Sequence, residues 1–172
     1  MSIKNLLIRK KSAVVDRWFD LIIGTYPEDS RRALSRKKDR FHNPIGFTIS
    51  REIQYIYDQF VGDMDNEILM KALDNIIKIR SVQNWTASEA VSFTLLLKDA
   101  MRKELKDTQM DKKNIDEMYE LDSRIDKITQ FAFDIYTSCR ERMYEIKVSE
   151  IKRRSLMAFN RLNENEINRD RN

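Results

Sequence analysis

Cysteine, histidine, proline and glycine are scarce in this sequence, which contains one, one, two and three of them respectively. The single cysteine, Cys139, excludes an internal disulfide and favours a reducing compartment. Three glycines leave little room for a glycine-rich phosphate loop or a G-x-S-x-G elbow. No run of eighteen apolar residues occurs, and Arg9, Lys10 and Lys11 interrupt the N-terminal apolar segment. We therefore predict a cytoplasmic protein with no membrane span and no signal peptide.

The residues that are abundant indicate long helices. Of the 172 residues, 41% are hydrophobic, which is enough for the core of one domain. Another 35% are charged, above the usual quarter, and few Gly or Pro residues interrupt the chain. Lys and Arg number 32 against 28 Asp and Glu, a net charge of +4. That surplus is a weak signal for nucleic acid, so we do not expect nucleic acid as a partner.

Apolar residues recur at three- and four-residue spacing along most of the chain, and no convincing strand pattern occurs. The predicted fold class is all-α, a bundle of about six helices with a long C-terminal helix. Ser2, Asn43, Asp65 and Thr86 are the expected helix starts, and Thr86 is expected to form a capping box with Glu89. The predicted helices cover residues 2–23, 28–38, 44–61, 65–82, 86–107 and 115–162.

The last predicted helix contains neither Gly nor Pro over about 48 residues, which makes it roughly 70 Å long at 1.5 Å per residue. A heptad seam runs along it, apolar up to Ile146 and partly polar afterwards. We expect its C-terminal part to project or to pair with another chain, so the predicted oligomer is a homodimer. We place a domain at 1–148 and a projecting helix with a frayed tail at 149–172. The seam consists of Ile125, Ile128, Ala132, Ile135, Cys139, Arg142, Ile146, Ser149, Arg153 and Leu156.

The segment RKKDRFHNPIGF, residues 36–47, holds the only histidine and could be a ligand site, a nucleic-acid patch or a turn. Asp39 and His42 form a D-x-x-H pair, but a metal site needs more ligands and there is no second histidine. The basic run 31–40 lacks the interleaved aromatic residues that stack on bases. Proline and glycine within the segment are typical of a turn between helices. We therefore predict a structural turn, with no metal and no cofactor.

No catalytic constellation is visible, and we predict that the protein is not an enzyme. The acidic residues between 116 and 126 share helix faces, which is typical of a solvated helix N-terminus. Cys139 has no histidine near it in sequence and no second cysteine at redox spacing. Aromatic residues leave one binding function open, because an apolar ligand pocket could form among Trp18, Phe93, Phe131 and Tyr136.

Four blocks of the sequence form a recognisable series: RWFDLIIGTYP (17–27), KDRFHNPIGF (38–47), IIKIRSVQNWTASEAVSFTLLLK (76–98) and IDKITQFAFDIYTSCRERMYEIK (125–147). In their order and spacing the chain resembles the N-terminal domain of the stressosome RsbT co-antagonist family of the RsbRD type. The resemblance implies an all-helical, globin-like fold that binds no haem and is usually dimeric. It also implies a sensory or scaffold role in bacterial stress signalling, with a signalling protein as partner.

The resemblance implies structural roles for residues within these blocks. Buried polar members such as Arg80, Gln83 and Asp134 would bond to each other or to helix ends. His42 stands where the family tends to have a small residue, which argues further against a ligand role. The other residues to which the resemblance assigns a structural role are Tyr26, Pro27, Phe41, Asn43, Pro44, Gly46, Tyr136, Cys139, Arg140 and Tyr144.

Family members often carry a C-terminal phosphorylatable STAS domain, and we expect none here because the chain stops at Asn172. The chain is then either a stand-alone sensor module or a fragment. The leading hypothesis is a non-enzymatic bacterial signalling module that dimerises and transmits its state along the last helix. The alternative is a haem-free, globin-like protein that binds a small molecule. The transmission residues would be Ile135, Cys139, Arg142, Ile146, Arg153 and Leu156.

Overall fold

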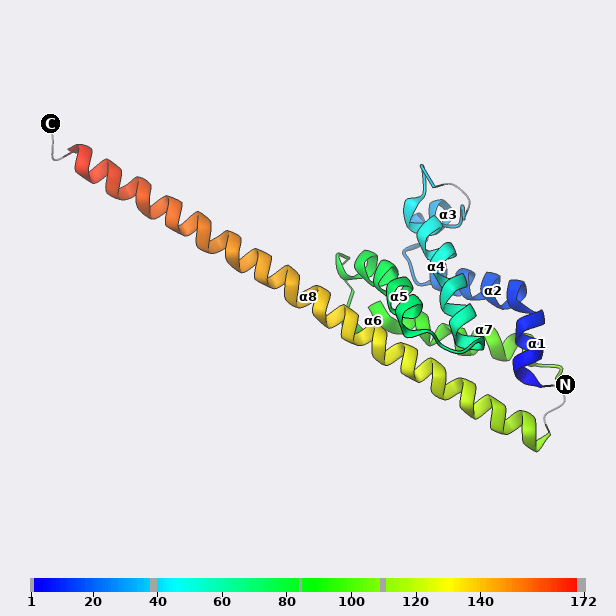
Figure 1. Cartoon of the computed structure of the whole chain (residues 1–172). Coiled ribbons are helices and arrows are strands. Elements are labelled where there is room, and N and C mark those ends of the chain that lie inside the picture. Colours follow the sequence, from blue (N-terminus) through cyan, green and yellow to red (C-terminus); the bar gives the residue numbers. More distant parts are fainter. Residues whose placement is uncertain (1, 38–39, 84, 109–110, 170–172) are drawn as a thin grey trace. The chain divides into compact units, whose positions relative to one another are not determined.

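A computed structural model describes residues 2–37, 40–83, 85–108 and 111–169, with side chains up to residue 161. These residues form helices and contain no strand (Figure 1). No helix in this part of the chain is both long and apolar enough to cross a membrane. The elements are α1 (Ile3–Arg9), α2 (Lys11–Gly24), α3 (Glu28–Leu34), α4 (Pro44–Val61), α5 (Asn66–Ser81), α6 (Ala87–Val91), the 3₁₀ helix η1 (Ser92–Thr94), α7 (Leu96–Leu105) and α8 (Lys112–Arg169).

The all-α class predicted from the sequence is confirmed, and the arrangement is globin-like. Each of the six predicted helices has a counterpart, but two of them are divided. The first is split at Lys10 into α1 and α2, and the fifth is split by η1 into α6 and α7. All four predicted helix starts, Ser2, Asn43, Asp65 and Thr86, cap their helices with a side-chain oxygen, and Thr86 forms its capping box with Glu89.

The core lies where α2 packs against α4 and α7, and where α4 packs against α5 (Figure 1). The apolar stripe predicted for α4 is fully buried at Ile49, Ile53, Ile56 and Phe60. Burying each of these side chains contributes roughly 1.5–3 kcal/mol. The stripe of α5 is equally buried at Leu69, Leu73, Ile76 and Ile77.

The N-terminal part of α8 belongs to the same packed body. Ile125, Ile128 and Ala132 are buried, as the heptad pattern predicted. The Arg124 guanidinium donates to the carbonyl oxygens of Phe60 at 3.0 Å and Gly62 at 2.6 Å. These bonds satisfy carbonyl groups that the end of α4 leaves without helical partners. Ion pairs from Lys98 to Asp126 and from Arg102 to Asp122 connect α7 to α8.

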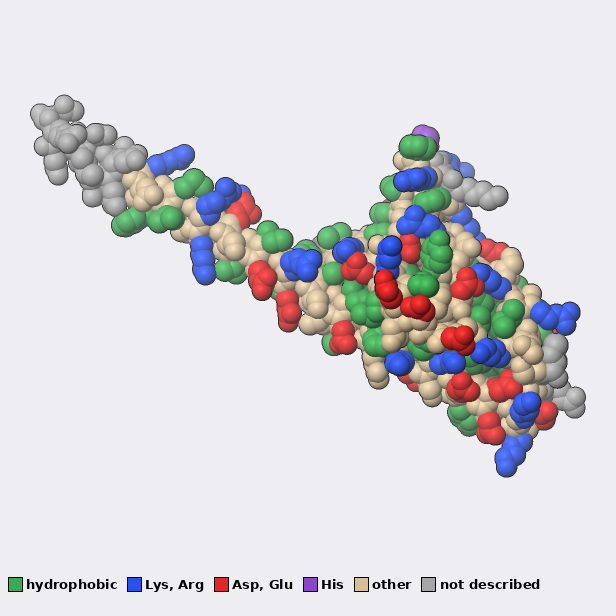
Figure 2. Space-filling model, in the orientation of Figure 1, with side chains coloured by type: hydrophobic (Ala, Val, Ile, Leu, Met, Phe, Trp, Pro, Cys, Tyr) green, Lys and Arg blue, Asp and Glu red, His purple; other side chains and the backbone are tan. Residues whose placement is uncertain are grey.

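The chain divides into two compact units, Met1–Tyr136 and Thr137–Asn172. The domain boundary predicted at 148 stays a prediction. Within the second unit the backbone is helical as far as Arg169. Several large apolar side chains of this unit are exposed, including Ile146, Ile151 and Leu156 (Figure 2). The projecting extension and the frayed tail stay predictions, and the side chain of Leu162, the predicted helix end, lies outside the described residues.

The turn before α4 is held by Asn43, which is only 4% exposed. Its side-chain Oδ1 accepts from the Gly46 amide at 2.9 Å and caps α4. Its Nδ2 donates to the carbonyl oxygen of Leu34, the last residue of α3, at 2.8 Å and to that of Arg36, just beyond α3, at 3.2 Å. His42 next to it is exposed, and Asp39 of the D-x-x-H pair lies outside the described residues. Among the described residues no group of three or more potential ligands could hold a metal ion.

Candidate functional site

The most unusual side chain of the packed body is Arg80, near the end of α5, because it is charged and 0% exposed. One of its terminal nitrogens, Nη1, donates to the carbonyl oxygen of Glu89 at 3.1 Å. The other, Nη2, donates to the hydroxyl of Thr25 at 3.2 Å. Arg80 thus connects the C-cap of α2 to the residues of α6, two segments that are distant in sequence.

Three aromatic rings surround the same guanidinium. Its central carbon lies 4.1 Å from the centre of the Trp85 ring, 5.3 Å from Phe93 and 5.4 Å from Tyr26. The rings of Tyr26 and Trp85 are themselves 5.1 Å apart and tilted by 54°. Rings at these distances attract a cation through their negative faces, and more strongly when water is excluded. We call Thr25, Tyr26, Arg80, Trp85 and Phe93 the Arg80 cluster.

The electrostatics of the Arg80 cluster follow from its burial. Burial lowers the pKa of Arg80 to about 10, against the opposing effect of the Tyr26 hydroxyl. Burial also raises the pKa of Tyr26, and the positive charge of Arg80 partly offsets that rise. Within the described residues no carboxylate forms an ion pair with Arg80, and neither its Nε nor the Tyr26 hydroxyl has a hydrogen-bond partner. The site therefore holds the positive charge of Arg80 together with two polar groups, Arg80 Nε and the Tyr26 hydroxyl, that have no hydrogen-bond partner among the described residues.

A cavity of about 530 Å³ lies next to the Arg80 cluster. Arg31 of α3 lines it and is held in place, since its Nε donates to the Tyr26 carbonyl oxygen at 2.8 Å. Glu89 also lines it, but its carboxylate accepts from the backbone amide and the hydroxyl of Thr86, both at 2.8 Å. Those two bonds lower the pKa of Glu89. The lining residues are Thr25, Tyr26, Pro27, Arg31, Trp85, Glu89 and Ser92.

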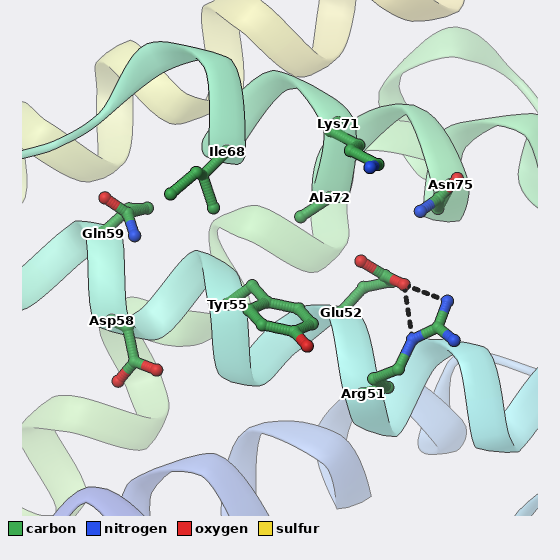
Figure 3. A pocket seen from close by; sticks show the side chains of 9 residues that line it. All are labelled: Arg51, Glu52, Tyr55, Asp58, Gln59, Ile68, Lys71, Ala72 and Asn75. Atoms are coloured by element: carbon green, nitrogen blue, oxygen red, sulfur yellow. Dashed lines mark hydrogen bonds and ion pairs between the residues drawn. The ribbon is translucent and has the colours of Figure 1, made fainter.

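A second hollow of about 510 Å³ lies between α4 and α5 (Figure 3). Its polar floor is Glu52, which is 3% exposed and accepts from Arg51 Nε at 2.8 Å. Tyr55 and Ile68 are 49% and 43% exposed and belong to its two sides. Arg51 pairs with Glu52 and Lys11 pairs with Asp58, while Lys71 also lines the hollow. The charges of this hollow are therefore mixed, and Tyr55 supplies the one aromatic ring among the residues that line it. We call the cavity next to the Arg80 cluster the Arg80 cavity, and we regard it as the stronger candidate site.

Three of the four aromatic residues predicted to form a pocket lie in the core, and Phe131 is half-buried. Trp18 and Phe93 are fully buried, and the Trp18 indole N–H donates to the Phe93 carbonyl at 2.6 Å. Tyr136 is 6% exposed and donates from its hydroxyl to the Trp85 carbonyl at 3.1 Å. Phe131 is half-buried, with the Lys127 ammonium 5.6 Å from its ring centre. The Arg80 cavity is not lined by any of these four side chains, so the pocket among them stays a prediction.

The predicted transmission residues become more exposed along α8. Ile135 and Cys139 are half-buried, whereas Ile146 and Leu156 are each 61% exposed. The two arginines of this set, Arg142 and Arg153, are exposed as well. Their predicted role in pairing two chains stays a prediction.

The residues to which the family resemblance assigns structural roles lie partly in the core and partly at the surface. Arg80 is bonded to helix ends, as the resemblance implied, and Gln83 is half-buried with its Oε1 unpartnered among the described residues. Asp134 differs from expectation, because it lies at the surface. Tyr26, Asn43 and Gly46 are buried and Arg140 is half-buried, whereas Pro27, Phe41, Pro44 and Tyr144 are exposed, Phe41 by 92%.

Sequence reasoning missed how Arg80 and its surroundings come together. Thr25 and Tyr26 lie more than fifty residues before Arg80, so no local spacing relates them to it, to Trp85 or to Glu89. One signal was available, because Arg80 continues the apolar stripe of Leu73, Ile76 and Ile77 at helical spacing. A charged residue on the buried face of a helix predicts a special environment.

The family description "RsbT co-antagonist protein rsbRD N-terminal domain" matches residues 12–150 of the 172. The chain belongs to this family. No curated protein matches the sequence, and no solved structure matches it either. The part that matches the RsbRD N-terminal domain includes α2 to α7, the Arg80 cluster and α8 as far as Glu150. Membership in this regulatory family implies a stressosome-type signalling module, which works through protein–protein interaction.

Proposed function

We propose that this RsbRD N-terminal domain is a non-enzymatic sensory module of bacterial stress signalling that acts in the cytoplasm as a homodimer. Family membership over residues 12–150 supports the signalling role. Its dimerisation would create the surface that a signalling partner recognises. The observation that carries the proposal is the exposed apolar surface of α8 beyond Tyr136.

The second unit presents more apolar surface than a solitary helix in water would favour. Ile146 and Leu156 belong to the heptad seam, and a helix with such a seam is stabilised when it pairs. Apolar side chains next to the seam add to this surface. Among the side chains described, up to residue 161, the exposed large apolar residues of the unit are Tyr144, Ile146, Val148, Ile151, Leu156, Met157 and Phe159.

The proposed mechanism is a change in helix pairing. Arg142, Ser149 and Arg153 interrupt the seam with polar groups, which lowers the stability of a single fixed pairing. A ligand or partner that binds one arrangement better would then shift the population between two arrangements. The change in pairing would then be transmitted along α8, because α8 is one continuous helix.

Oxidative cross-linking through Cys139 tests the proposed dimer with the natural side chain. In a parallel pair along the seam, Cys139 of one protomer meets Cys139 of its partner, so mild oxidation should give a covalent dimer on a denaturing gel. The control variant combines C139S with K147C, which moves the thiol off the seam and should cross-link poorly. A monomer by sedimentation equilibrium at all accessible concentrations would contradict the proposal.

Small-molecule binding is the second candidate function, and the cavity beside the Arg80 cluster favours it. Native mass spectrometry of the purified chain distinguishes the two functions. A dimer without added mass supports the partner-binding module. A species with a defined additional mass supports the ligand-binding function.

A further inference from the structure

Arg80 carries a buried positive charge that no carboxylate in the described part of the chain balances. Its guanidinium is enclosed by rings and donates to the Glu89 carbonyl and the Thr25 hydroxyl, both of them neutral groups. Proteins normally pair a buried charge, because removing an ion from water is costly. A negative group held close to Arg80 would therefore be stabilised.

The cavity described above is lined by residues that contact the Arg80 guanidinium, although Arg80 itself does not line it. Thr25, Tyr26, Trp85 and Glu89 all contact the guanidinium and all line the cavity. One layer of protein atoms thus separates the charge from the cavity. Protein atoms screen charge less than water does, so the attraction for an anion extends into the cavity.

Arg31 supplies a second cation at the same cavity. Its Nε is bound to the Tyr26 carbonyl, which fixes the plane of the guanidinium at the cavity wall. Its two terminal nitrogens form no ion pair with a carboxylate in the described part of the chain. A guanidinium held this way is suited to a carboxylate or phosphate, which it binds with two parallel hydrogen bonds.

The remaining wall contributes a hydroxyl and aromatic surface. Tyr26 is 4% exposed, and its hydroxyl has no hydrogen-bond partner among the described residues. The ring of Trp85 forms another part of the lining. A volume of about 530 Å³ is within the range of small-molecule sites.

We propose that this cavity binds a small organic anion with a flat apolar body. Its carboxylate or phosphate lies against Arg31 on the wall in front of Arg80, and its body packs on Trp85 and Tyr26. The carboxylate of Glu89 opposes an anion, but the amide and hydroxyl of Thr86 already bind it. Arg31 lines the cavity and Arg80 lies behind its wall, so two positive charges act on an anion there against the one negative charge of Glu89.

The inference is separate from the proposed dimer. Every residue of the cavity belongs to the Met1–Tyr136 unit, whereas the dimer concerns the exposed surface of α8. Loss of ligand binding would leave Cys139 cross-linking unchanged. Loss of cross-linking would leave the anion titration unchanged, so failure of either proposal can be recognised by itself.

The test uses the two tryptophan side chains as reporters in the full-length protein. Benzoate and phenyl phosphate are titrated while the indole N–H signals are followed by ¹H–¹⁵N NMR, and benzylamine serves as a probe of opposite charge. We expect the Trp85 signal to move and saturate with at least one anion. The Trp18 signal should stay in place, because that indole is buried and bonded to the Phe93 carbonyl.

The variant R31A removes the exposed cation without touching the core, and R32A on the same short helix is the matched control. Both arginines are exposed, but only Arg31 lines the cavity. We expect R31A to raise the dissociation constant at least about tenfold, since it removes charge-assisted hydrogen bonds, and R32A to leave it unchanged.

Three results would overturn the proposal. They are the absence of a saturable Trp85 shift with both anions, an R31A titration that matches the wild type, and binding of benzylamine as tight as that of benzoate. Saturation by benzoate alone identifies a carboxylate ligand, and saturation by phenyl phosphate alone identifies a phosphate ester. Either of these supports the proposal.

Discussion

At the scale of single residues, Asn43 shows how one side chain can join two helices. Its oxygen accepts from the Gly46 amide at the start of α4, while its nitrogen donates to the Leu34 carbonyl at the end of α3. The fit is close, because a Cβ on Gly46 would lie 2.2 Å from both Asn43 Nδ2 and the Leu34 oxygen. This contact explains why the sequence has glycine at 46, and it makes the segment a structural turn.

Replacing Asn43 separates its two roles. N43A removes the cap and the donor, and we expect the free energy of unfolding to fall by about 2–3 kcal/mol. N43D keeps the capping oxygen but turns a carboxylate oxygen toward the Leu34 carbonyl, so it should destabilise although aspartate is a good cap. Urea denaturation measures both effects. N66A, at an exposed helix start, is the control and should change stability little; an N43D as stable as wild type would contradict this account.

The burial of Tyr57 gives a prediction for how the free energy of unfolding depends on pH. Burial, with a smaller contribution from the charge of Asp58, raises the pKa of Tyr57 above its ordinary value. Between pH about 10 and the higher folded-state pKa, the unfolded chain binds fewer protons than the folded one. The contribution of Tyr57 to the free energy of unfolding is therefore constant below pH 10 and falls as the pH rises above it.

The variant Y57F tests this pH dependence. The Tyr57 hydroxyl donates to the Leu7 carbonyl at 3.0 Å, so Y57F should lose about 1 kcal/mol at pH 7. It should then show a weaker decline of the melting temperature above pH 10 than the wild type. Y119F, at a tyrosine that is 69% exposed, should keep the wild-type decline. Parallel curves for Y57F and wild type would refute the assigned role of burial.

At the scale of elements, periodicity predicted where helices lie but not where two of them break. The sequence around Lys10 has no Gly or Pro, yet α1 ends there, and the Lys10 ammonium donates to the Glu104 carbonyl at 2.5 Å. At η1 the Phe93 carbonyl accepts from the Trp18 indole, and the Thr94 hydroxyl lies 2.8 Å from that of Thr129. In both places the helix breaks where hydrogen bonds reach residues more than thirty positions away. Local sequence patterns do not include such distant residues, so they could not predict these breaks.

The polar positions in the α8 seam give a prediction for this element. Replacing Arg142 and Arg153 together by leucine should stabilise the proposed helix pair and lower the dimer dissociation constant at least about tenfold. The physical reason is that leucine packs at seam positions, where a guanidinium must stay hydrated. Sedimentation equilibrium measures the effect. The pair E141L and K147L, at positions on the outer side of the heptad, is the control, and an unchanged constant for the seam variant would contradict the proposed mechanism.

At the scale of the whole molecule, the two units differ in how their helices are stabilised. In Met1–Tyr136 the helices bury apolar faces against one another, as at Ile53 and Ile77. In Thr137–Asn172 the described apolar side chains are largely exposed, and the proposed pairing would bury them. Most helical stability in proteins comes from such packing.

Hydrogen exchange should therefore distinguish the units. Amides of residues 49–60 should exchange slowly at every protein concentration, because their side chains are buried within one chain. Amides of residues 140–160 should become protected as the concentration rises through the dimer dissociation constant. Mass spectrometry of exchanged peptides resolves the two segments. Protection of 140–160 that does not change with dilution in a demonstrated monomer would show that pairing is not its cause.

The sequence by itself determined the helical class, the six helical segments, the structural turn and the family. Each depends on local patterns of apolar spacing, caps and motifs, which residues such as Asn43 and Thr86 carry within a few positions. Only the tertiary structure decided where the helices break and that Thr25 and Tyr26 meet Arg80. The physical reason is that burial and the loss of water act between segments far apart in the chain, and they turn an ordinary arginine into a buried charge.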